Sequence, residues 1–64
     1  MCLSTVYRAE RKPGNQILTN VQKIEDRGGT IVLTNIMEQQ VAVEGRILLA
    51  DLVEGYVVIE ESVA

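Results

Sequence analysis

The chain has 64 residues, a hydrophobic fraction of 47% and a formal net charge of −3. We expect one domain over residues 1–64 with a thin stability margin, because a domain of about this size buries only about 60% of the surface that its unfolded chain exposes. No run approaches the roughly 18 apolar residues of a membrane-spanning helix, and the first residues lack the features of a signal peptide, so we expect a cytoplasmic protein.

The first half of the chain predicts two strands joined by a loop. Residues 2–9 hold three consecutive β-favouring residues and no helix cap, which indicates an opening strand. Residues 10–15 contain a Pro-Gly pair that favours a tight reversal. Residues 18–27 predict a second strand, and the Gly28-Gly29 pair after it is typical of a two-residue hairpin turn.

The middle of the chain predicts two more strands. Residues 30–36 form the clearest strand, a β-branched run that is apolar on both faces and therefore suited to a buried central position. Residues 37–39 would turn the chain. Residues 40–44 then alternate between polar and apolar side chains, and we expect this strand to end at Gly45.

The last third of the chain is open to two interpretations. The apolar residues of 46–53 fit a strand, but they also fit the spacing of one helical turn. We expect a strand because Glu54-Gly55 is a turn signal and residues 56–60 favour β structure strongly. The two segments would then form a terminal hairpin.

These six short antiparallel strands predict an all-β fold, a small SH3-like barrel or half-barrel. The core should be aliphatic, since the only aromatic residues are two tyrosines. An open sheet of this kind leaves unpaired backbone groups at its edges and apolar surface uncovered. We therefore expect a homodimer, in which the second copy covers both.

Enzymatic chemistry is not expected. The chain has no histidine, which removes the commonest general base and the commonest metal ligand. Adjacent carboxylates such as Glu25-Asp26 and Glu60-Glu61 would point to opposite faces of a strand and form no acid/base couple. We interpret them as solvated strand residues.

The one residue with distinctive chemistry is Cys2, the only cysteine of the chain. A single thiol cannot form an internal disulfide and fits a reducing compartment. If Met1 is removed, the α-amine and thiolate of Cys2 can chelate one metal ion, and two such ends can share it in a dimer. If Met1 is retained, its amine, the Cys2 amide nitrogen and the Cys2 thiolate can bind in one plane. Both arrangements suit square-planar Ni(II) or Cu(II) better than tetrahedral Zn(II).

A structural role for Cys2 is the alternative. A lone cysteine in a strand usually behaves as a small apolar side chain, and a single thiol without histidine lacks the usual signature of a metal site. The residues alone do not decide between the two roles.

The sequence resembles the CooT family of small nickel-binding proteins over nearly its whole length. The specific mark is the Met1-Cys2 start before the first strand. The other similar segments are short strand and turn sequences: Val6-Tyr7, Asn20-Val21, residues 26–29, residues 33–36, residues 45–47 and residues 52–59.

This resemblance implies a homodimer of SH3-like subunits in which Cys2 binds Ni(II) near the two-fold axis. It also implies a task in maturing the nickel site of carbon monoxide dehydrogenase, which would then be the client protein. Only Cys2 carries over as a metal ligand.

Two other functions are weighed against nickel binding. The family is also labelled as predicted RNA-binding proteins, and Arg8, Arg11 and Lys12 could form a basic spot beside Tyr7. The net negative charge and the scarcity of aromatic residues argue against nucleic acid binding. The third possibility is a structural subunit of a larger assembly, which would use the apolar surface that so small a fold leaves uncovered.

Overall fold

The fold is a small all-β barrel of the SH3-like kind, as expected. The computed structural model describes residues 3–62, so Cys2 lies outside the described residues. The described chain forms five strands and one short 3-10 turn: β1 (Ser4–Arg8), the turn Pro13–Asn15, β2 (Gln16–Asp26), β3 (Thr30–Asn35), β4 (Gln40–Asp51) and β5 (Tyr56–Glu61).

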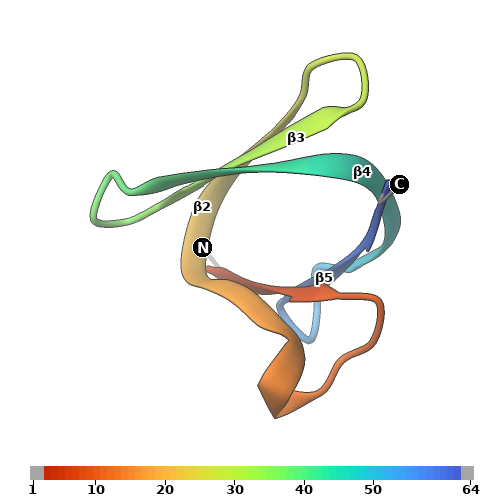
Figure 1. The fold of residues 1–64 in the computed structure, drawn as a ribbon. Helices are drawn as coiled ribbons and strands as arrows, with labels where there is room; N and C mark the ends of the chain where they lie inside the picture. Colours follow the sequence, from red (N-terminus) through yellow and green to blue (C-terminus); the bar gives the residue numbers. More distant parts are fainter. Residues whose placement is uncertain (1–2, 63–64) are drawn as a thin grey trace.

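The strands close into a barrel in the order β1-β2-β3-β4-β5 (Figure 1). Each strand pairs antiparallel with the next along the chain, but β1 and β5 pair parallel, with Val6 opposite Val57. The parallel pair follows from the odd strand number, because the first and fifth strands of a meander run in the same direction. We expected only antiparallel strand pairs, and this expectation is wrong for the β1–β5 pair alone among the described strands.

Gly45 accounts for the difference between six expected strands and the five described. We expected Gly45 to end a strand, whereas β4 runs through it without a break and pairs it with Glu61. A Cβ atom at Gly45 would lie 2.0 Å from the carbonyl oxygen of Glu60. Glycine is required here because the backbone of β5 approaches closely, and such an approach is a common reason for glycine inside a strand.

The other turn predictions are confirmed. Gly28 and Gly29 have positive φ angles of 66° and 103°, and the amide of Arg27 donates to the carbonyl of Thr30 over 2.8 Å, which closes the predicted hairpin. Of the predicted strand over residues 46–53, residues 46–51 belong to β4, so the strand interpretation holds for them and the helical one does not, whereas Leu52 and Val53 lie in the turn.

The core is aliphatic, as predicted, and it fills the inside of the barrel. The buried cluster contains only branched aliphatic side chains contributed by all five strands: Val6, Val21, Ile31, Leu33, Val43, Val57 and Ile59. Because the barrel closes on itself, the described strands have no free sheet edge of the kind that we expected a second copy to cover.

Apolar surface is nevertheless left outside. The most exposed large apolar side chains are Met37, Leu52 and Val53, with exposed fractions of 74%, 72% and 92%. Residues 3–62 contain no helix of the length and apolarity that crossing a membrane requires.

Candidate functional site

The described chain begins beside the turn that joins β4 to β5. A Cβ atom on Gly55 would lie 3.4 Å from the carbonyl oxygen of Leu3, and the amide of Thr5 donates to the Gly55 carbonyl over 3.0 Å. The residue that follows Cys2 in the chain is therefore held against this turn.

One carboxylate holds the β4–β5 turn in shape. The side-chain oxygen Oδ1 of Asp51 accepts hydrogen bonds from the amides of Val53 and Glu54, at 3.1 and 2.9 Å. The Gly55 amide donates to the Asp51 carbonyl over 2.9 Å. This bonding leaves the side chains of Leu52, Val53 and Glu54 exposed.

A small hollow of about 260 Å³ lies close to the chain start, where Ser4 and Leu52 form part of its lining. Its other lining residues are mostly apolar and come from β2, β4 and β5: Val21, Gln22, Lys23, Ile24, Ile47, Ala50 and Val57. The lining offers an amine, an amide and a hydroxyl but no thiol or carboxylate, so its donor set does not favour a metal ion.

Metal ligands are scarce in the described part of the chain. Within residues 3–62, no three His, Cys, Asp or Glu side chains come together in a group that could hold a metal ion. Since the whole sequence has no histidine and one cysteine, Cys2 is the one thiolate ligand that the chain can offer, beside the thioethers of Met1 and Met37.

The predicted basic spot comes together only in part, since Arg11 and Lys12 line one groove without Arg8, and its charge is largely offset. Arg8 forms an ion pair with Glu61 of β5, and Lys12 forms one with Glu10 over 3.1 Å. No carboxylate of residues 3–62 forms an ion pair with Arg11. Only one of the three cations thus remains for a phosphate, whereas nucleic acid binding needs a basic patch or stripe.

Arg11 instead lies against an aromatic pair. Its guanidinium carbon is 4.2 Å from the centroid of the Tyr56 ring, within the range of a cation–π interaction. Tyr56 meets Tyr7 edge to face, with ring centroids 6.3 Å apart and an angle of 78° between the ring planes. The Tyr56 ring thus covers one side of the Arg11 guanidinium.

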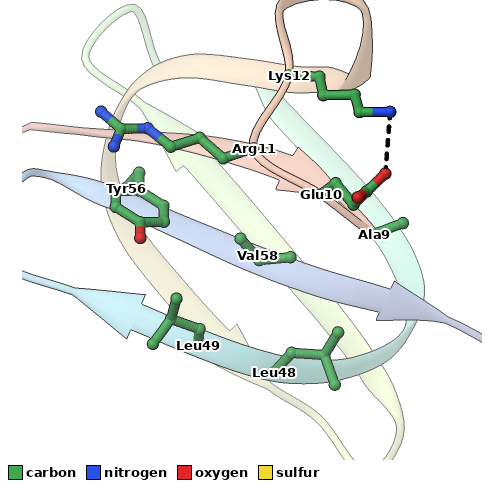
Figure 2. Close-up of a pocket in the computed structure, with 8 residues that line it drawn as sticks. All are labelled: Ala9, Glu10, Arg11, Lys12, Leu48, Leu49, Tyr56 and Val58. Atoms are coloured by element: carbon green, nitrogen blue, oxygen red, sulfur yellow. Dashed lines mark ion pairs between the residues drawn. The ribbon is translucent and has the colours of Figure 1, made fainter.

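A larger groove of about 450 Å³ opens below Arg11 on the outside of the barrel (Figure 2). The loop after β1 supplies its polar rim, and β4 and β5 supply its apolar floor. The lining residues are Ala9, Glu10, Arg11, Lys12, Leu48, Leu49, Tyr56 and Val58.

The apolar floor of this groove depends on an irregularity in β4. The register between β4 and β5 shifts between Ile47 and Leu49, so Leu48 is an extra residue in the ladder. In a regular strand two successive side chains point to opposite faces, but here Leu48 and Leu49 both line the outer groove. Sequence reasoning missed this pair as a surface feature, because alternation assigns one of two adjacent leucines to the core.

Comparisons with known proteins place the chain in a family. Residues 1–60 match the family described as CO dehydrogenase accessory protein CooT. A search of the curated proteins found no match. Among solved structures, the chain is similar to a provisionally assigned CooT from Carboxydothermus hydrogenoformans, with 19% sequence identity, a TM-score of 0.84 and coverage of 97% of this chain and 100% of that one. That likeness supports the fold, and the family match over residues 1–60 shows that the chain belongs to the CooT family of CO dehydrogenase accessory proteins.

Proposed function

We propose that this protein binds Ni(II) through Cys2 at a homodimer interface and serves the maturation of the nickel site of CO dehydrogenase. The observation that carries the proposal is the family match, which covers residues 1–60 and so includes the only thiol of the chain. In this role the protein is a non-catalytic carrier and Ni(II) is its cargo.

The chemistry of the available donors supports nickel. A thiolate combined with an amine or amide nitrogen is a strong-field donor set that favours square-planar ions such as Ni(II). Within residues 3–62, no group of three His, Cys, Asp or Glu side chains competes with Cys2 for a metal ion, which supports a site at Cys2.

The surroundings of the chain start support a dimer. Leu3, with an exposed fraction of 38%, lies beside a turn that exposes Leu52 and Val53. A second copy that covers these apolar side chains would bring two chain starts to one interface. Two copies would then offer two thiolates, whereas a single chain offers one.

Nickel titration tests the proposal. Metal-free wild-type protein and the Cys2→Ser variant are titrated with Ni(II) while thiolate-to-nickel charge-transfer absorption and binding heat are recorded. We expect the wild type to show the absorption band and to bind tightly, and the variant to lose the band and most of the affinity. Equal affinity of the two proteins would remove Cys2 from the site.

A further inference from the structure

The outer groove and the β4–β5 turn are complementary in polarity and charge. The groove has an apolar floor, formed mainly by Leu48, Leu49 and Val58, and Arg11 at its rim. The turn exposes two apolar side chains, Leu52 and Val53, followed at once by an acidic one. Both surfaces are therefore apolar, and the charges that accompany them are opposite in sign.

The unbalanced charge in the groove belongs to Arg11. Of the six lysine and arginine residues in the sequence, five form ion pairs with carboxylates of the described chain, and Arg11 is the exception. Lys12 also lines the groove, but its partner Glu10 lies there too. The rim of the groove thus has a net positive charge that a carboxylate would offset.

The bulge in β4 gives a second indication that this face is covered. It places Leu48 and Leu49 together on the surface with exposed fractions of 46% and 47%. These two leucines form contiguous apolar surface beside a cation that has no carboxylate partner in the described chain, and contiguous apolar surface marks interaction sites.

We propose that the β4–β5 turn of one copy docks into the outer groove of a second copy, with Glu54 pairing with Arg11 and Leu52 and Val53 covering Leu48 and Leu49. This inference rests on the dimer of the proposed function and names its contact surfaces. Tyr56 both follows the turn and lines the groove, so the two surfaces adjoin on each chain. Two copies related by a two-fold axis near Tyr56 therefore make the contact twice, and the interface closes.

The size of the chain is consistent with using both surfaces. Its accessible surface is 4339 Å², and a stable dimer buries about 800 Å² per partner, which is roughly a fifth of that area. The reciprocal contact uses both surfaces on each chain and so buries twice the area of a single contact between one turn and one groove.

Charge reversal tests the inference on metal-free protein by sedimentation velocity over a range of concentrations. We expect the wild type to sediment with twice the chain mass of 7.1 kDa. Arg11→Glu and Glu54→Arg should each raise the dissociation constant of the dimer at least about tenfold, because each places like charges in contact. The double variant should return to within about threefold of the wild type, because it restores the pair in the opposite sense.

The matched control is Arg27→Glu, which makes the same charge change in the β2–β3 turn, away from the groove and from the β4–β5 turn. It should leave the dimer unchanged. Four results would each overturn the inference. The wild type could be a monomer or could form species larger than a dimer. The single reversals could leave the dissociation constant unchanged, or the double variant could have a dissociation constant as high as that of the single variants.

Nickel titration of the same variants separates this inference from the proposed function. If the reversals leave the dimer intact while Cys2→Ser abolishes nickel binding, the interface is wrong and the nickel proposal stands. If the reversals and their rescue behave as expected while the wild type takes up no nickel, the interface stands without the nickel proposal.

Discussion

Gly45 and Glu60 approach so closely that a Cβ atom on Gly45 would lie 2.0 Å from the carbonyl oxygen of Glu60. Two further backbone atoms, of Glu60 and Glu61, would each lie 2.9 Å from that Cβ. All three are main-chain atoms of β5, so no side chain can rotate away to make room. The packing of β4 on β5, and with it the closed barrel, depends on glycine at this position.

The first prediction concerns this contact. Gly45→Ala forces the two strands apart, and we expect it to lower the free energy of unfolding by about 3 kcal/mol, as other overpacked positions do. Urea unfolding followed by circular dichroism measures the loss. Gly14→Ala is the control, because a Cβ there meets nothing within 4 Å and should change stability by less than about 1 kcal/mol. Equal losses in the two variants would contradict the argument.

The second prediction concerns Asn35, which is buried with an exposed fraction of 5%. Its Oδ1 accepts from the amides of Met37 and Gln39 at 2.9 and 3.0 Å, and its Nδ2 donates to Gln39 Oε1 over 2.8 Å. Asn35→Ala leaves these partners unpaired, and we expect a loss of about 2 kcal/mol in thermal or urea unfolding.

Gln40→Ala is the control for Asn35, because the exposed Gln40 side chain makes one hydrogen bond, to Thr34 Oγ1 over 3.2 Å. It should cost less than about 1 kcal/mol. If Asn35→Ala costs no more than this control, the buried side chain does not organise the β3–β4 turn.

The third prediction concerns the core. Ile59 has no exposed surface, and Ile59→Ala removes buried methyl groups and leaves a cavity, which costs about 3 kcal/mol. A small single core rarely supplies more than about 5 kcal/mol, so the variant should keep about 2 kcal/mol or less, and its urea midpoint should fall by more than half. Met37→Ala, at an exposed fraction of 74%, is the control and should stay as folded as the wild type. Near-native stability of Ile59→Ala would show that the core is not where the buried side chains place it.

The fourth prediction is the pH dependence of nickel binding under the proposed function. The thiol and the nitrogen donor must each lose a proton before they bind metal, so acid competes with nickel for both. We expect the apparent affinity to fall by about tenfold per pH unit for each proton displaced as pH is lowered. Isothermal titration at several pH values in buffers of different ionisation enthalpy measures both the affinity and the protons released.

The Cys2→Ser variant is the comparison for this pH series, since any residual nickel binding there lacks thiol deprotonation. Its affinity should depend less steeply on pH than that of the wild type. A wild-type affinity that does not change between pH 8 and pH 6 would exclude a thiolate ligand.

Local sequence was sufficient to predict most of the secondary structure. The β-branched run over residues 30–36 and the Gly28-Gly29 turn carry their information in side-chain shape and permitted φ angles, which act over a few residues. The Cys2 thiol is read directly from the sequence, and its role as a metal ligand stays a prediction because Cys2 lies outside the described residues.

The tertiary structure decided what depends on contacts between distant residues. Gly45 looks like a strand end from its neighbours, but the backbone of β5 makes it the middle of a strand. The outward turn of both Leu48 and Leu49 arises from the register that β4 adopts against β5. Glu10 shares the groove with Arg11 but forms its ion pair with Lys12. Strand pairing and ion pairing join residues far apart along the chain. Alternation and composition are local patterns, so they do not predict these contacts.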